Sequence, residues 1–178
     1  MDDGYRLELI TPESLNEIEK DWLENADEDV FELELAIVFD HFRGISSQEH
    51  GENDAYIFGL FDNLKGSCLA LAEMVSSKRR SVSKLLKVTL SPVFIPDLSG
   101  MKESEKQTLA GIYKSLFMNI IIHEGTEGFD EVRIYARTPD MFELLDLVAK
   151  RWNNESNDNT DTVSMKGRWL VISHQPKG

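Results

Sequence analysis

The sequence has 178 residues, 41% of them hydrophobic, and a formal net charge of −13 from 32 acidic and 19 basic residues. This length is enough for one domain with a buried core, and the hydrophobic content is above that of disordered chains. The negative charge argues against non-specific binding to nucleic acid, which depends on neutralising phosphates. It is compatible with solubility alone, with a basic protein partner or with a cationic substrate.

Three further features bear on location. The chain begins MDDGYRLE without an apolar leader segment, and its longest apolar run, residues 116–122, is too short to span a bilayer. The single cysteine, Cys68, excludes a disulfide within the chain, and we expect it to be a small buried hydrophobic residue rather than a nucleophile. We therefore expect a cytoplasmic protein with neither a membrane nor a nucleic-acid partner.

The first third of the chain predicts one strand and two helices. Residues 5–10 alternate apolar and polar side chains, as a half-buried strand does. Thr11 and Pro12 supply an N-cap and a first-turn proline for a helix that ends near residue 25. Apolar residues at helical spacing predict a second helix over residues 29–42.

Three strands with short connections come next. Residues 55–61 and 67–75 indicate a hairpin, because the turn between them contains Asn and Gly. A basic, serine-rich connection over residues 76–84 leads to an apolar strand, residues 85–91. Pro92 ends that strand because proline cannot donate to a ladder.

The rest of the chain alternates helices and strands. After a polar loop, strong helical periodicity predicts a long helix over residues 104–124. We expect a strand at 131–136, a helix at 139–151 and a closing hairpin of residues 162–165 and 169–174. The element order predicts an antiparallel meander followed by a parallel pair of strands in the same sheet. The predicted fold class is α/β (α+β), with a single domain over residues 1–178, a mixed sheet of about six to seven strands, and helices on both faces.

This order of elements resembles the GCN5-related N-acetyltransferase (GNAT) fold over nearly the whole chain. In that family, a Q/R-x-x-G-x-G/A signature after the fourth strand binds the pyrophosphate of acetyl-CoA through backbone amides, at a helix N-terminus. The segment 111–117 resembles a degenerate form of this motif, with Thr108 in place of the Arg or Gln and Tyr113 in place of the second glycine. The resemblance implies acetyl-CoA as cofactor, and it implies four cofactor-binding residues: Leu90, Gly111, Ile112 and Tyr113.

Two residues are candidates for catalysis. Glu73 lies between Ala72 and Met74 in a predicted strand, and a carboxylate among apolar neighbours can act as general base for an amine. Ser91 would lie near the mouth of the sheet in a GNAT arrangement, where it could contact an acyl carbonyl. The alternatives are an outward-facing glutamate and a serine that merely ends its strand.

Two charged clusters and four histidines complete the candidates. The basic run from Lys78 to Lys87 could bind the 3′-phosphate of CoA or another acidic partner, or it could be a solvated loop. The acidic cluster from Glu24 to Glu34 could favour a cationic acceptor, or it could be a solvated face. The histidines show no metal-binding spacing, so no metal site is predicted.

Two main functions remain open. The first is an acyl-CoA-dependent N-acyltransferase acting on an amine of a small molecule or protein. The alternative is a catalytically inactive GNAT-like domain serving as a binding or regulatory module for a protein partner. A third function, mimicry of nucleic acid toward a basic partner, rests on charge alone.

Overall fold

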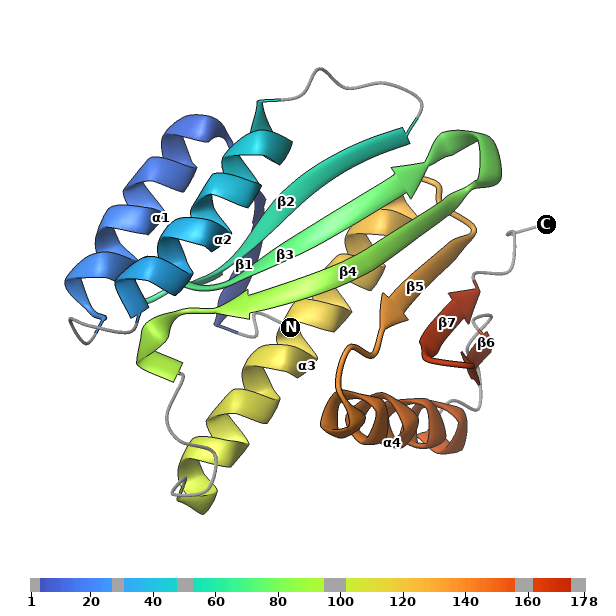
Figure 1. Cartoon of the computed structure of the whole chain (residues 1–178). Helices are drawn as coiled ribbons and strands as arrows, with labels where there is room; N and C mark the ends of the chain where they lie inside the picture. The colour runs from blue at the N-terminus through green and yellow to red at the C-terminus, as the bar shows by residue number, and fades with distance from the viewer. Residues whose placement is uncertain (1–3, 27–30, 48–52, 95–101, 156–161, 174–178) are drawn as a thin grey trace. The chain divides into compact units, whose positions relative to one another are not determined.

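A computed structural model describes residues 4–26, 31–47, 53–94, 102–155 and 162–173 (Figure 1). Its elements follow the predicted order of strands and helices. They are β1 (Tyr5–Leu9), α1 (Pro12–Glu24), α2 (Phe31–Ser46), β2 (Asn53–Asp62), β3 (Cys68–Ser77), β4 (Val82–Leu90), α3 (Glu103–Thr126), β5 (Glu131–Tyr135), α4 (Pro139–Glu155), β6 (Thr162–Lys166) and β7 (Trp169–Ser173). Short 3-10 turns, Lys78–Arg80 and Pro92–Phe94, lie at the two ends of β4.

The strands form one seven-stranded sheet in the order β1-β2-β3-β4-β5-β7-β6. The β1–β2 pair is antiparallel, as are β5–β7 and β6–β7, whereas β4 and β5 run parallel. Parallel neighbours need a crossover connection, which α3 supplies between β4 and β5. The predicted mixed sheet and the parallel pair are therefore confirmed.

The chain divides into two compact units. Unit 1 comprises Met1–His50, Ala55–Glu73 and Val88–Ile120. Unit 2 comprises Gly51–Asp54, Met74–Lys87 and Ile121–Gly178. The prediction of one domain over residues 1–178 stays a prediction.

The core of unit 1 forms where α1 and α2 pack against the strands, while α3 crosses their other face (Figure 1). Helix α1 begins with a capping box in which Thr11 and Ser14 exchange hydrogen bonds between side chain and backbone. Trp22 of α1 is fully buried, and its indole N–H donates to the carbonyl of Cys68 over 3.0 Å. Its ring meets Phe39 of α2 edge to face at 5.6 Å. Trp22 therefore joins both helices to β3.

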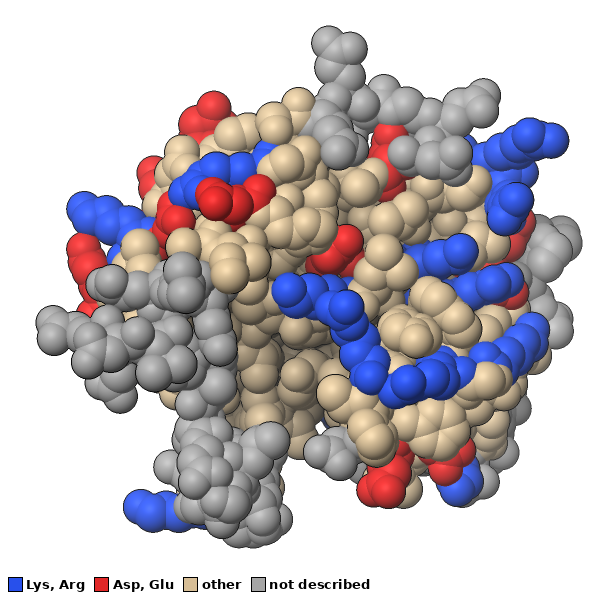
Figure 2. Space-filling view, in the orientation of Figure 1, with Lys and Arg blue, Asp and Glu red and all other residues tan. Residues whose placement is uncertain are grey.

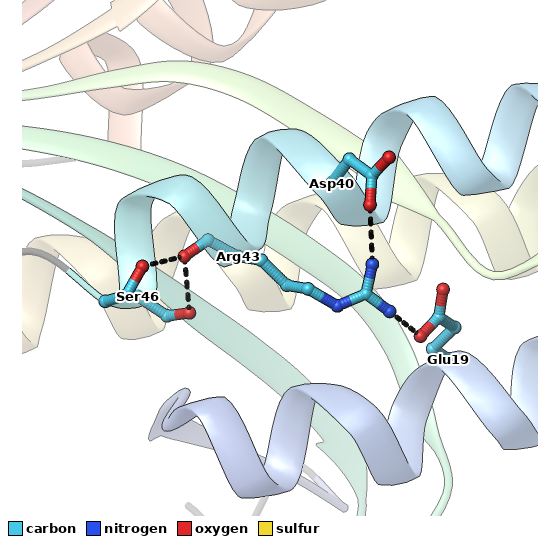
Figure 3. A network of polar contacts seen from close by, with 5 residues as sticks. Glu19, Asp40, Arg43 and Ser46 are labelled. Carbon is cyan, nitrogen blue, oxygen red and sulfur yellow. Dashed lines mark hydrogen bonds and ion pairs between the residues drawn. The ribbon is translucent and has the colours of Figure 1, made fainter.

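A polar network also joins the two helices (Figure 3). Arg43 of α2 binds Asp40 on its own helix at 2.7 Å and Glu19 on α1. The hydrogen bond that the Arg43 guanidinium donates to the Glu19 carboxylate raises the pKa of Arg43, which therefore stays charged. Because 42% of the Arg43 side chain is exposed, this network orients the helices more than it stabilises them.

In unit 2, Ser81 closes the turn between β3 and β4 with a left-handed backbone, φ 52°. Its carbonyl accepts from the amides of Asp130 at 3.0 Å and Glu131 at 3.1 Å. Its hydroxyl donates to the carbonyl of Gly128 and accepts from the amide of Asp130. These bonds hold the turn against the start of β5 and stabilise a conformation that is unusual outside glycine.

Three predicted boundaries were wrong, two of them for identifiable reasons. Helix α2 continues to Ser46, beyond the predicted end at residue 42, because Ile45 is buried in the unit 1 core. Strand β4 begins at Val82 rather than residue 85, because Ser81 closes a tight hairpin and Ser83 is already buried in the sheet. Helix α4 reaches Glu155 rather than residue 151.

In the described parts of the chain, no helix is long and apolar enough to cross a membrane.

We expect Ser81→Ala to lower the free energy of unfolding by about 1–2 kcal/mol, because it removes both hydroxyl bonds but keeps the left-handed backbone. Ser81→Gly loses the same bonds but relieves a backbone cost of about 1 kcal/mol, so it should be the more stable of the two variants. Urea unfolding measures both differences. Equal stability of the two variants would mean that the backbone at residue 81 is not strained.

Candidate functional site

The predicted catalytic carboxylate lies on β3 in unit 1. Ala72 and Met74 on either side of Glu73 are fully buried, and the Glu73 side chain itself is 14% exposed. Strand alternation places Glu73 on the same face as Leu71, which belongs to the core beneath α1 and α2. The carboxylate is therefore partly enclosed by apolar surface and still reached by solvent.

His41 of α2 is the direct partner of this carboxylate. Its Nε2 lies 3.0 Å from Oε2 of Glu73, and its side chain is 50% exposed. Since a carboxylate only accepts, the imidazole N–H is the donor. The bond fixes one oxygen of Glu73 and leaves the other lone pairs of the carboxylate for a further donor.

Sequence reasoning missed this pair. The histidines show no metal-binding spacing, and nothing in the sequence links His41 on α2 to β3 across 32 positions. The available signal was the phase of α2: Phe39 and Phe42 are buried, so position 41 lies at the border of the buried face. That signal identifies a histidine near the core, but it does not identify its partner.

The other predicted catalytic residue, Ser91, follows the last residue of β4 and is 5% exposed. Its amide donates to the carbonyl of Leu69 over 2.9 Å, and its carbonyl accepts from the amide of Phe94 over 2.9 Å. Its backbone is thus engaged, and only its hydroxyl could meet a ligand. Leu90, a predicted cofactor-binding residue, precedes it and is half-buried.

Thr89, which sequence reasoning did not single out, carries a buried hydroxyl oxygen without a hydrogen-bond partner among the described residues. Buried hydroxyls are almost always hydrogen-bonded, so such a group requires an explanation. Its neighbours are Leu90 and Ser91. The end of β4 therefore offers a polar atom that a ligand or a water molecule could satisfy.

The other predicted cofactor-binding residues, Gly111, Ile112 and Tyr113, lie inside α3, which begins at Glu103. An amide at that depth donates to the carbonyl one turn earlier and is not free for a phosphate. Ile112 is 1% exposed, and the ring of Tyr113 lies 5.8 Å from that of Phe117. This segment therefore does not fit an amide cradle for pyrophosphate, and its cofactor contacts stay a prediction.

Burial raises the pKa of Tyr113, so its phenol stays protonated at neutral pH.

Parts of two predicted features lie outside the described residues. The loop before α3 is described only up to residue 94 and from residue 102. Of the acidic cluster, residues 27–29 are outside as well. Among the described residues, no group of His, Cys, Asp and Glu has the arrangement of a metal site.

Cys68 is 3% exposed, and burial raises the pKa of its thiol to about 12. Its Sγ donates to the carbonyl of Ala70 at 3.4 Å. Because the thiolate is the reactive form, a thiol with this pKa is not a nucleophile at neutral pH.

We expect Cys68 to resist a thiol-specific reagent in the folded protein at pH 7–8 and to react fully after unfolding in guanidinium chloride. Its folded pKa is raised, so thiolate formation becomes favourable only near pH 12. Colorimetric thiol titration under both conditions measures the difference. Rapid labelling of the native protein would contradict the burial of Cys68.

Similar folds occur among solved acetyltransferase structures. A probable acetyltransferase from Staphylococcus epidermidis is 15% identical to this chain with a TM-score of 0.52, over 96% of this chain and 99% of the other. A Vibrio cholerae protein provisionally named a ribosomal-protein-serine acetyltransferase is 11% identical with a TM-score of 0.50, over 99% of this chain and 96% of the other. No protein-family model and no curated protein matches the sequence. The chain has a GNAT-like fold, as its order of elements predicted.

Proposed function

We propose that this protein is an acyl-CoA-dependent N-acyltransferase that acts on an amine of a small molecule or protein. The observation that carries the proposal is the likeness of fold, over nearly the whole chain, to two proteins named as acetyltransferases. Because one fold can host many activities, the chemistry is assigned from the residues of unit 1.

Glu73 is the proposed general base. Acyl transfer to an amine forms a carbon–nitrogen bond, releases a thiol and requires the amine to lose a proton. The Glu73 carboxylate is partly enclosed and has free lone pairs, so it can accept that proton. His41 is a positioning residue in this proposal, because its N–H orients the carboxylate from one side.

The end of β4 is the proposed location of the acyl group. The hydroxyls of Thr89 and Ser91 are the available donors there, and one of them would polarise the acyl carbonyl. Contacts with Leu90, Gly111, Ile112 and Tyr113 belong to the same proposal. For Gly111 and Tyr113 they would be made by the helix surface and the Tyr113 hydroxyl, not by free amides. Ile112 is 1% exposed, so its part would be to pack beneath that surface.

The acceptor is proposed to be cationic. A net charge of −13 raises the local concentration of cationic substrates around the protein. The Vibrio cholerae protein is named for a ribosomal protein, which supports testing protein amines beside small ones. A basic protein partner satisfies the same charge argument.

A second function is favoured by one specific observation. Gly111 lies within α3, and Tyr113 takes the place of the second motif glycine, so residues 111–113 do not offer the amide cradle that the family motif provides. A GNAT-like domain without that cradle would bind no acyl donor and would work as a binding or regulatory module for a protein partner.

Titration with acetyl-CoA distinguishes the two functions. If the protein is a transferase, acetyl-CoA binds saturably in calorimetry and raises the melting temperature as its concentration passes Kd. Free pantetheine, which lacks the phosphates, is the matched control for non-specific stabilisation. No heat and no shift at millimolar acetyl-CoA would exclude the transferase and favour the binding module.

Substitution of the base tests the proposed chemistry. We expect Glu73→Gln to lower kcat by about a hundred-fold or more, measured as release of CoA thiol with a panel of small amines and basic peptides. The KM for acetyl-CoA should stay unchanged, because the proposed role is in proton transfer. His41→Ala should lower kcat by about ten-fold, the value of one lost hydrogen bond.

Glu17→Gln, an exposed carboxylate on α1, is the matched control and should leave kcat unchanged. Thermal unfolding of each variant separates loss of chemistry from loss of fold. Full activity of Glu73→Gln would remove Glu73 from the mechanism.

A further inference from the structure

A cavity of about 380 Å³ lies in unit 2, beside the turn between β3 and β4. Four of its lining residues are cationic: Arg79, Arg80, Lys84 and Arg133. None of the lining residues that the structure describes is acidic. Figure 2 shows Lys and Arg side chains gathering over the end of this hairpin and over β5 and β7. On a chain whose net charge is −13, this cavity is a local region of positive potential.

Two of these cations lie directly opposite each other in the sheet. In the parallel register of β4 and β5, Lys84 is the partner of Arg133. Like charges in directly opposite positions destabilise a pair of strands. Glu131 accepts from Nε of Arg133, and Nζ of Lys84 lies 5.8 Å from the ring centre of Trp169. The carboxylate of Glu131 balances the charge of Arg133, but Trp169 is uncharged, so its contact does not balance the charge of Lys84.

The other two cations lie on a turn whose backbone is held in place. Arg79 and Arg80 belong to the exposed 3-10 turn that Ser81 closes. Ser81 bonds to Gly128, Asp130 and Glu131, so the turn is held against the start of β5. Because the backbone of this turn is already held in place, a ligand that binds these arginines has less conformational entropy to remove.

We propose that this cavity binds the phosphate group of a small anionic molecule. A guanidinium group can donate two parallel hydrogen bonds to two oxygens of one phosphate. The described lining of the cavity contains three guanidinium groups and one ammonium group. Ser76 and Ser77 also line it and supply hydroxyl donors, while Val75 and Val82 supply apolar wall for a carbon skeleton. The volume lies within the usual range for small-molecule sites, about 300–1,000 Å³.

The sheet order favours a small molecule over an acidic peptide. An extended peptide commonly binds by adding a strand to an open sheet edge. The strands around this cavity, β3, β4 and β5, are internal, and the edges of the sheet are β1 and β6. The proposed site requires no transferase activity.

Calorimetric titration of the full chain with inorganic pyrophosphate tests the proposal. We expect one saturable site whose affinity falls as salt is raised. Arg79→Ala and Arg80→Ala should each weaken binding by about ten-fold or more. Lys78→Ala is the matched control, because Lys78 lies on the same exposed turn but does not line the cavity. It should change the affinity by less than about three-fold.

Three results would overturn the proposal. They are no saturable pyrophosphate binding, equal weakening by Lys78→Ala and Arg80→Ala, and binding of a glutamate-rich peptide without binding of pyrophosphate. Thermal unfolding checks that each variant is folded. Lys84→Met provides a second test within β4, and it should weaken binding as the arginine variants do.

Competition identifies the source of the phosphate. If coenzyme A displaces pyrophosphate and dephospho-coenzyme A does not, the occupant is the 3′-phosphate of coenzyme A. Displacement by neither assigns the site to a different phosphorylated molecule. Both outcomes support a phosphate site, and the pyrophosphate titration stands whether or not acyl transfer is observed.

Discussion

The parallel pairing of β4 with β5 is the constraint on which the rest of the structure depends. It runs only from Val82 opposite Glu131 to Leu85 opposite Ile134, so its register needs support from outside the strands. Ser81 provides that support, because its carbonyl and hydroxyl bind the segment that enters β5. The same register places Lys84 beside Arg133. The bonds of Ser81 thus support the register that places two cations side by side in the cavity of unit 2.

In unit 1, the packing of α2 sets the position of the candidate catalytic residues. Burial of Phe39 and Phe42 fixes the rotation of this helix over the strands, and that rotation brings His41 to Glu73. The polar pair lies at the border of an apolar core, where solvent still reaches the carboxylate. Such a position combines a defined orientation with access for a substrate, which a fully buried or fully exposed carboxylate lacks.

Much of the fold was predictable because the elements carry local signals. The alternation in β1, the Thr11–Pro12 helix start and the long periodic stripe of α3 each depend on neighbours within one or two turns. The boundaries at Ser46 and Val82 were not predictable in this way. Ile45 and Ser83 are buried by distant parts of the chain, and this burial extended a helix and a strand through residues whose composition favours a loop.

For the candidate site, the sequence alone determined Glu73 as a carboxylate in an apolar strand, the basic run before β4, and the unusual residues around Gly111. Only the tertiary structure decided the partners: His41 for Glu73 and Arg133 for Lys84. The physical reason is that charge and periodicity are properties of a segment. Hydrogen bonds and cross-strand neighbours are instead properties of packing between segments that the sequence leaves far apart.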